Sequence, residues 1–256
     1  VCLFQCQQFD RRVRCQRGGE FNACGGQLGP GLGQLGGRPQ QGTHWRQPDQ
    51  GGFDRRLHLV RELVVDLFFQ LSALIKKLNI SSEYSIDSFP IHTCDNIRIA
   101  NSKLIQGEIY RGKKVSMRRY FYGYNVHVLC TADGIPVEYT FLPGRSHDSN
   151  ALKQMPLQVP SGSIIYADNA YTNYSIEDML KDAENIDLLV ARKSDSKRKH
   201  EPYVEYLISS VRKRIETSFS EISNFLPKKI HAVTEFGFLL KVVIFIFGYA
   251  ISRTIL

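Results

Sequence analysis

The sequence predicts an α/β fold in which a mixed β-sheet is covered by helices. Two observations support this prediction. β-prone segments cluster first in the organised part of the chain and then alternate with helical segments, an order typical of sheets with both antiparallel and parallel strands. The expected order is strand, strand, strand, helix, strand, helix, strand, helix, with further helices at both ends. The 256 residues are 43% hydrophobic, which is enough for a sizeable core and excludes wholesale disorder.

Residues 1–52 differ in composition from the rest of the chain. They hold 12 of the 20 glycines, four of the six cysteines and ten glutamines, without an apolar period. Glycine raises the entropy cost of ordering the backbone, and few bulky apolar side chains offset that cost here. We therefore expect a low-complexity segment that is either disordered or translated out of frame, because the chain begins with Val1 instead of methionine. Its cysteines lack the paired Cys-x-x-Cys spacing of zinc sites.

The organised part begins with a helix and a strand. Apolar residues recur at spacings of three and four and predict an amphipathic helix from about Phe53 to Leu78. The β-prone run Tyr84–Ser88 follows and leads into Pro90. We therefore expect a short strand with Asp87 near its end.

A β-hairpin is expected next. Arg119–Thr131 is rich in β-prone residues, Ala132–Pro136 contains an Asp-Gly turn, and Val137–Leu142 has the character of a returning antiparallel strand. Pro143-Gly144 ends that strand. Ser149–Met155 is then expected to form a short helix.

Two further strands alternate with helices. Ser163–Asp168 is a short apolar strand that ends on an aspartate, and Ile186–Ala191 is another. Between them, Ser175–Asp182 is expected to be helical, with its first residue as the N-cap. A longer helix, from about Val204 to Phe225, carries an apolar face with Glu216 beside it.

The last predicted helix, from about Thr234 to Ile255, is strongly apolar. Lys241 and Arg253 interrupt it, and the uninterrupted run Val242–Ser252 has 11 residues. A bilayer span needs about 20 residues, so we expect a buried core helix and no membrane. The front of the chain also lacks the apolar core of a secretory signal.

Three carboxylates stand where they are able to converge. Asp87 and Asp168 end two strands, and Glu216 lies on a helix that can cross the sheet. Converging carboxylates repel each other unless a cation neutralises them, and oxygen-only ligands suit Mg²⁺ or Mn²⁺. Two such ions about 4 Å apart support phosphodiester chemistry. Each residue alone has a common structural alternative, since aspartate often forms turns and helical glutamate is usually solvated.

Five motifs add a resemblance that covers about residues 53–256. They are SIDSFP around Asp87, RRYFYGYNVH, DGIPVEYTFLPGRSHDSNAL, IIYADNAYTNY around Asp168, and RKRIETSFSEISNFLPKKIHAVTEFGF around Glu216. Together they resemble a DDE transposase of bacterial insertion sequences, most closely the subgroup numbered 982. The resemblance implies a ribonuclease H-like core in which Asp87, Asp168 and Glu216 form a catalytic, metal-binding triad for two Mg²⁺ or Mn²⁺ ions.

The resemblance also implies a reaction and partners. The reaction is hydrolytic nicking at the ends of the element, followed by attack of a 3′-hydroxyl on target DNA. The implied partners are terminal inverted repeats, target DNA and a second copy of the chain, in the bacterial cytoplasm. Residues 53–80 would be the helical remnant of an N-terminal region, and residues 81–256 the catalytic domain.

The residues around Glu216 depart from a pattern common in related transposases. That pattern is Tyr-x2-Arg-x3-Glu-x6-Lys. Arg212 matches its arginine, whereas Ser209 and Ser223 occupy the tyrosine and lysine positions. The two serines put the predicted contacts with the DNA end in question, but they do not change the predicted metal-binding triad.

The predicted DNA contacts are basic residues of an irregular stretch and of the helix that bears Glu216. They are Arg111, Lys113, Lys114, Arg118, Arg119, Arg212 and Lys213. Phosphate contacts position DNA and make its binding salt-dependent, whereas the alternative for each residue is a solvated charged face. The formal net charge of +8 permits such a partner.

Three residues are expected to have a structural or supporting role beside the carboxylates: His147, Asp148 and Asn169. Asp148 also suits the N-cap of the following helix. His127 is expected to pack in the core. Two other functions stay open, namely a plain metal-dependent nuclease without strand transfer and an inactive remnant that at most binds DNA.

Overall fold

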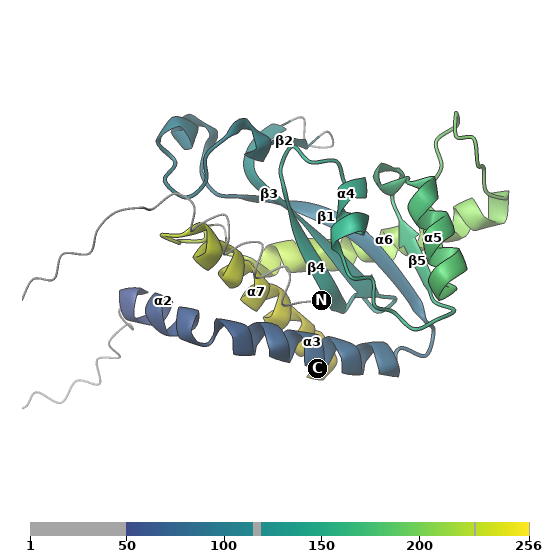
Figure 1. The fold of residues 1–256 in the computed structure, drawn as a ribbon, viewed down its shortest axis with the longest axis horizontal. Coiled ribbons are helices and arrows are strands. Elements are labelled where there is room, and N and C mark those ends of the chain that lie inside the picture. The colour runs from purple at the N-terminus through teal and green to yellow at the C-terminus, as the bar shows by residue number, and fades with distance from the viewer. Residues whose placement is uncertain (1–49, 115–118, 228, 256) are drawn as a thin grey trace, which may run out of the picture. The chain divides into compact units, whose positions relative to one another are not determined.

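The computed structural model describes residues 50–114, 119–227 and 229–255. Helices lie on both faces of one six-stranded mixed sheet (Figure 1). The elements in chain order are α2 (Gln50–Leu59), α3 (Arg61–Leu78), β1 (Glu83–His92), η1 (Asn96–Asn101), η2 (Glu108–Tyr110), β2 (Arg111–Lys114), β3 (Arg119–Thr131), β4 (Pro136–Pro143), α4 (Ser149–Gln154), β5 (Ile164–Ala167), η3 (Asn169–Tyr171), α5 (Tyr174–Glu184), β6 (Asp187–Val190), α6 (Pro202–Phe225) and α7 (Glu235–Ile255). The predicted fold class is confirmed, with β2 as an additional short strand.

The sheet combines antiparallel and parallel pairs. Its order is β2-β3-β1-β5-β6, and β4 pairs with β3 as well. β1 is antiparallel to β3 and parallel to β5, which is in turn parallel to β6. The carboxyl ends of β5 and β6 therefore lie beside Ile86 in the middle of β1, and ligands commonly bind beyond the ends of such parallel strands in α/β folds.

Two apolar clusters cover the two faces of the sheet. On one face, α6 and α7 contribute residues such as Ile215 and Val242 to a cluster with Phe89 of β1. On the other face, residues of α4 and α5, including Leu152 and Leu180, pack with Ile86. α3 contacts β4 and α7, and its Phe68 is fully buried. Alternation along β1 thus sends Phe89 to one face and Ile86 to the other, as the two-residue period of a strand requires.

The first predicted strand was too short. β1 continues through Pro90 to His92, so Asp87 lies within the strand and not at its end. β5 pairs with β1 only as far as Ile86, and beyond it β3 is the one neighbour described. One edge of β1 is therefore unpaired at Pro90, where a residue without an N–H donor is tolerated.

Two predicted helix boundaries also need correction. The helix expected from Phe53 to Leu78 is divided at Val60 into α2 and α3. α5 begins one residue before Ser175, and its N-cap is Asn173, whose Oδ1 accepts a hydrogen bond from Ile176 N at 3.3 Å. Asparagine caps a helix as well as serine does, so propensity alone does not choose between them.

α7 is the one helix of the described chain that is long and apolar enough to cross a membrane, and half of that window is buried inside the fold. Phe238, Val242 and Ile246 are almost completely buried, and α7 contacts α3, α6 and β4. Thr234 Oγ1 caps its start by accepting from Gly237 N at 3.0 Å. These contacts are those of the core helix that the sequence predicts.

Residues 1–49, Arg118 and Lys228 lie outside the described residues. The prediction of a low-complexity front segment and one of the predicted DNA contacts therefore stay predictions. The same holds for the division of the chain at residues 52 and 80.

Candidate active site

Two of the three predicted carboxylates lie side by side. Ile86 of β1 pairs with Ala167 of β5 in parallel register, so Asp87 and Asp168 are the next residues on adjacent strands. Each carboxylate accepts a hydrogen bond from the backbone N–H that follows it, Asp87 from Ser88 and Asp168 from Asn169, both at 2.7 Å. Since adjacent strands are about 4.8 Å apart, the two acids share one small region of the sheet edge.

The two aspartates lie close enough to interact. Burial raises the pKa of Asp87 to about 6, and the nearby Asp168 carboxylate adds to the rise. The Ser88 N–H and the Arg212 guanidinium lower the pKa of Asp87 but do not cancel the effect of burial. The Asp168 side chain is 31% exposed. A buried anion beside a second anion is a place where a cation is favourable.

α6 carries the third predicted carboxylate across this face of the sheet. Pro202 occupies the first turn of the helix, and Ile208, Val211 and Ile215 are buried against β1 and β5. The apolar stripe fixes the rotation of α6 and places Arg212 and Glu216 beside the strand ends. Arg212 Nη1 lies 3.2 Å from Asp168 Oδ1, and its Nη2 lies 3.9 Å from Glu216 Oε1.

The structure does not gather all three acids around one point. The Glu216 side chain is 63% exposed, and Arg212 stands between it and Asp168. Within the described part of the chain, no three His, Cys, Asp or Glu side chains are close enough to hold a metal ion. Arg212, predicted as a DNA contact, is thus also the counter-charge of the carboxylates, a role that its spacing from Glu216 alone did not reveal.

Asp148 occupies the N-cap position of α4, as the sequence suggested, but its side chain makes no capping hydrogen bond. Ser149 N donates to His147 Nδ1 at 3.3 Å. Asp148 Oδ1 faces the buried His127 Nε2 at 3.9 Å. Burial raises the pKa of Asp148, and the Asp168 carboxylate adds to the rise. The carboxylates of Asp148 and Asp168 are therefore close enough to interact.

His127 and Asn169 lie close to the aspartates but differ in exposure. His127 is completely buried on β3, with Nδ1 2.7 Å from the Tyr171 hydroxyl, as core packing predicts. Asn169 supports Asp168 through its backbone N–H, while its own side chain is exposed. The contact between His127 and Tyr171 joins residues 44 positions apart, and no local pattern signals it.

The predicted basic run lies away from the aspartates. Arg111 and Lys113 are on β2, which pairs with the start of β3 at Arg119–Tyr122. Val128, the β3 residue opposite Asp87, is six residues beyond Tyr122, or about 20 Å along a strand. Lys114 and Arg119 are the last pair of that ladder.

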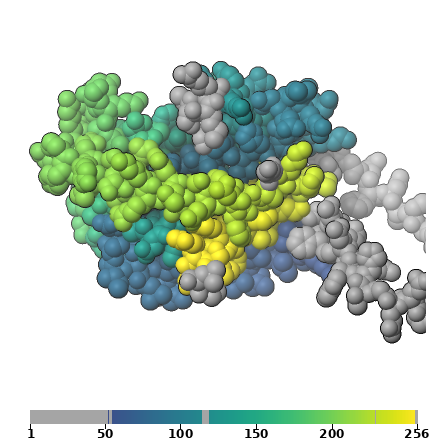
Figure 2. All heavy atoms as spheres, turned by 180° about the vertical axis from the view of Figure 1, so that it is seen from behind, coloured from purple at the N-terminus to yellow at the C-terminus, as the bar shows by residue number. Residues whose placement is uncertain are grey.

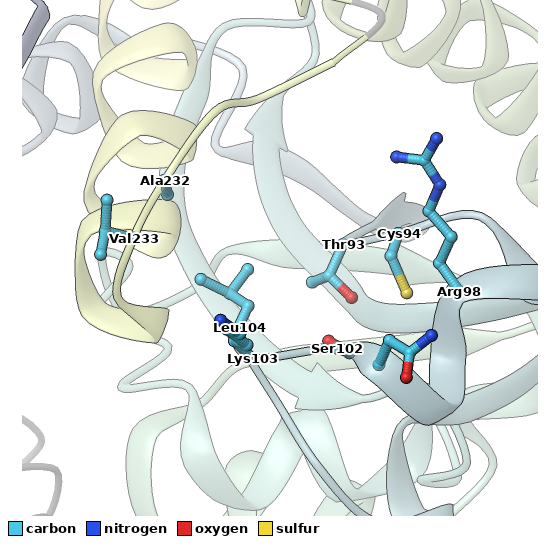
Figure 3. A pocket seen from close by; sticks show the side chains of 9 residues that line it. Thr93, Cys94, Arg98, Ser102, Lys103, Leu104, Ala232 and Val233 are labelled. Carbon is cyan, nitrogen blue, oxygen red and sulfur yellow. The ribbon is translucent and has the colours of Figure 1, made fainter.

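A surface cavity of about 520 Å³ lies elsewhere (Figure 3). Thr93, Cys94 and Leu104 from the segment after β1 line it together with Ala232 and Val233 from the segment before α7. It contains none of the predicted carboxylates. The candidate site is therefore an open sheet edge and not this cavity, as suits a large substrate.

Comparison with known families assigns the chain. A family model described as a transposase DDE domain matches residues 78–232, more than half of the chain. Comparisons with curated proteins and with solved structures find no match. The matched segment contains Asp87, Asp168 and Glu216, and the mixed sheet with its flanking helices fits the ribonuclease H-like fold of such domains. The chain belongs to the family of transposases with a DDE domain.

Proposed function

We propose that this transposase nicks DNA at the ends of an insertion sequence, with Asp87, Asp168 and Glu216 as its catalytic carboxylates. The exposed 3′-hydroxyl then attacks a target phosphodiester, which joins the element end to target DNA and releases the 3′-oxygen of the cut target strand. The adjacent register of Asp87 and Asp168 is the observation that best supports this proposal. α6 brings Glu216 to the same face of the sheet, one helical turn after Arg212. The alternative of a plain nuclease differs only in lacking the transfer step.

The donor set fits divalent metal ions. Its members offer only carboxylate oxygens, which are the ligands that Mg²⁺ and Mn²⁺ prefer. The raised pKa of Asp87 reflects an anion that lacks a sufficient counter-charge in its buried position. Asp87 and Asp168 would hold the ions, with Glu216 as the third ligand, and bound ions would activate the attacking oxygen and stabilise the leaving one.

Arg212 has a separate part in this proposal. In the absence of another cation, its guanidinium neutralises Asp168 and reaches Glu216. Arginine also binds phosphate in a two-pronged geometry. We infer that Arg212 exchanges its carboxylate partners for a DNA phosphate when the site is assembled, which frees Glu216 to turn toward the aspartates. His147, Asp148 and Asn169 keep the proposed supporting role.

The remaining finer predictions belong to the same proposal. We propose that the chain belongs to the insertion-sequence subgroup numbered 982, acts in the bacterial cytoplasm and binds both terminal repeats and target DNA. The basic residues of β2 and the start of β3 would contact DNA beyond the carboxylates, together with Lys213. Residues 1–52 are not part of the functional unit, residues 53–80 belong to an N-terminal region, and residues 81–256 form the catalytic domain.

The active form is proposed to be a homodimer, and α3 offers a self-complementary surface for it. Four leucines of its outer face are 43–66% exposed: Leu63, Leu67, Leu74 and Leu78. They are placed symmetrically about the midpoint between Gln70 and Leu71. Two antiparallel copies of α3 would pair Leu63 with Leu78 and Leu67 with Leu74, as an isologous interface requires.

Charge on α3 supports the same arrangement. Exposed Glu62 and Asp66 precede the midpoint, and exposed Lys77 follows it, so an antiparallel pair brings opposite charges together. Sedimentation equilibrium tests this interface. Leu67→Glu should give a monomer where the parent forms a dimer, and Lys77→Glu should weaken the dimer until Glu62→Lys and Asp66→Lys are added. A Leu67→Glu variant that stays dimeric would exclude this surface.

A nicking assay tests the catalytic proposal. Labelled duplex carrying the terminal repeats should be nicked in Mg²⁺ and remain intact in EDTA. Asp168→Asn should abolish nicking, whereas Asp182→Asn, an exposed acid on α5, should not affect it. Strand transfer of a pre-cleaved end separates a transposase from a nuclease. Nicking that survives Asp168→Asn would refute the proposed site.

A further inference from the structure

A second group of basic residues lies in the segment that follows β6, the strand next to β5. The segment Arg192–Glu201 joins β6 to α6, and it begins where Ala191 N donates to Ala167 O at 3.0 Å. Ala167 immediately precedes Asp168, so the segment starts one strand away from that acid. Lys193 is two residues beyond Ala191, so the basic segment begins near the end of β5.

Two arginines hold this segment in place. Arg192 and Arg198 lie over the Tyr174 ring at 5.1 and 4.8 Å. Arg192 also pairs with Glu177, with Nη1 3.0 Å from Oε1, and Arg198 Nη2 lies 2.9 Å from Asp178 Oδ2. These contacts tie the segment to α5, so its conformation is set before any ligand arrives.

The other basic residues of the segment are free for a ligand. Lys193, Lys197 and Lys199 are exposed, and they form no ion pair with the described residues. Arg192 and Arg198 already have acidic partners on α5, so the three lysines, against the exposed Asp195 and Glu201, leave the segment with one excess positive charge. Such charge attracts a phosphate backbone.

Two tyrosines at the start of α6 continue the surface. Tyr203 is 68% exposed and Tyr206 is 74% exposed, and neither ring has an aromatic contact or hydrogen bond within the described chain. Lys213 and Glu216 follow Tyr206 by seven and ten residues, which places the three side chains on one side of the helix. Tyr206 and Glu216 are about 15 Å apart along the helix axis. Figure 2 shows α6 as a yellow-green band across the surface, with the preceding green segment at one end.

We propose that Lys193, Lys197, Lys199, Tyr203 and Tyr206 bind single-stranded DNA and direct an unpaired strand along α6 toward the carboxylates. Exposed aromatic rings interleaved with basic side chains form stacking platforms for unpaired bases. Duplex DNA does not offer the faces of its bases to a side-chain ring, so the tyrosines favour a single strand. Only the destination of the strand rests on the proposed function, since binding itself needs no catalysis.

Fluorescence anisotropy of the full chain tests the tyrosines. The probes are a labelled oligonucleotide of about 20 nucleotides, longer than a typical binding site, and its duplex, both in EDTA so that no reaction occurs. Tyr203→Leu with Tyr206→Leu should weaken single-strand binding by about thirtyfold or more, because each of the two stacks contributes roughly 1–3 kcal/mol. Duplex affinity should be unchanged, and the double Phe variant should bind like the parent. Equal loss on both probes, or no loss, would overturn the proposal.

Salt dependence tests the lysines. Each phosphate contact with a single strand contributes roughly 0.7 to the slope of log affinity against log salt. Replacing Lys193, Lys197 and Lys199 with glutamine removes three such contacts and should therefore reduce the magnitude of the slope by about 2. Lys153→Gln, an exposed lysine on α4, should leave the slope unchanged. An unchanged slope in the triple variant would show that the three lysines do not contact the DNA. Because the binding assay contains no metal, it separates failure of this surface from failure of nicking.

Discussion

The Arg212 guanidinium lies 3.2 Å from the Asp168 carboxylate and thereby joins α6 to the end of β5. The same side chain reaches Glu216 at 3.9 Å. It is the positive charge that also lowers the pKa of Asp87, against the stronger effect of burial. One residue of α6 thus compensates three acids from three separate elements.

Arg212→Gln should make stability depend more strongly on divalent metal. Without metal, no positive charge compensates the carboxylates in the variant. We expect its free energy of unfolding to be about 1 kcal/mol lower than that of the parent, because these ion pairs are partly exposed. In a chain of this size that loss is a decrease of about 2–4 °C in Tm. Added Mg²⁺ should then raise the Tm of the variant more than that of the parent, because the ion replaces the missing charge.

Differential scanning fluorimetry in EDTA and in Mg²⁺ measures the effect. Arg214→Gln removes an exposed charge from the same helix and should respond to Mg²⁺ as the parent does. An Arg212→Gln variant with the parent's metal response would show that the guanidinium and the metal ions do not share the carboxylates.

Much of this arrangement was predictable, and the failures have physical causes. The run before Asp168 and the helix around Glu216 were expected within a few residues, because local apolar patterns mark both. The continuation of β1 beyond Ser88 was not expected, since the tolerance of Pro90 depends on where β5 stops pairing. The approach of Asp148 to His127 is likewise a contact between separate segments, and the Asp148 side chain makes no capping hydrogen bond although it occupies the N-cap position.

His127 should make the protein less stable at acidic pH. Burial lowers the pKa of His127 to about 3 from an ordinary value of 6.5. Below pH 6.5 the unfolded chain takes up a proton that the folded protein refuses, so stability falls as pH decreases toward 3 and levels off below it. At about 1.4 kcal/mol per pH unit, the free energy of unfolding decreases by at most about 5 kcal/mol between pH 6.5 and 3.

Urea unfolding at several pH values tests this prediction. His127→Gln keeps a partner for the Tyr171 hydroxyl and should flatten the decline between pH 6.5 and 4. Tyr171→Phe removes the 2.7 Å hydrogen bond but not the burial, so its slope should remain steep. Parallel profiles for the parent and His127→Gln would contradict the prediction.

Lys76→Met should destabilise the whole catalytic fold. Lys76 Nζ of α3 lies 2.6 Å from Glu138 Oε1 of β4, and the Glu138 side chain is 2% exposed. Glu138 also accepts the Leu157 and Gln158 N–H groups, both at 2.8 Å. Removing the ammonium leaves a buried carboxylate without its counter-ion, at a cost of about 3–5 kcal/mol.

Chemical denaturation of Lys76→Met measures that cost. Lys181→Met breaks an exposed pair with Asp187 and should cost less than about 1 kcal/mol. A loss for Lys76→Met as small as that for Lys181→Met would mean that the ion pair between Lys76 and Glu138 contributes little to stability despite its burial.

Gly134→Ala should destabilise the hairpin and α6 together. Gly134 has a φ of +79° in the Asp-Gly turn between β3 and β4, and a Cβ there would lie 2.0 Å from Ser218 Oγ of α6. The positive φ costs about 1 kcal/mol for a residue with a side chain, and the clash adds to it. Ser218→Gly in the same chain should recover the part due to the clash and leave the part due to φ. Thermal unfolding of the two single variants and the double variant separates these terms, and additive losses would show that the turn and α6 are not in contact.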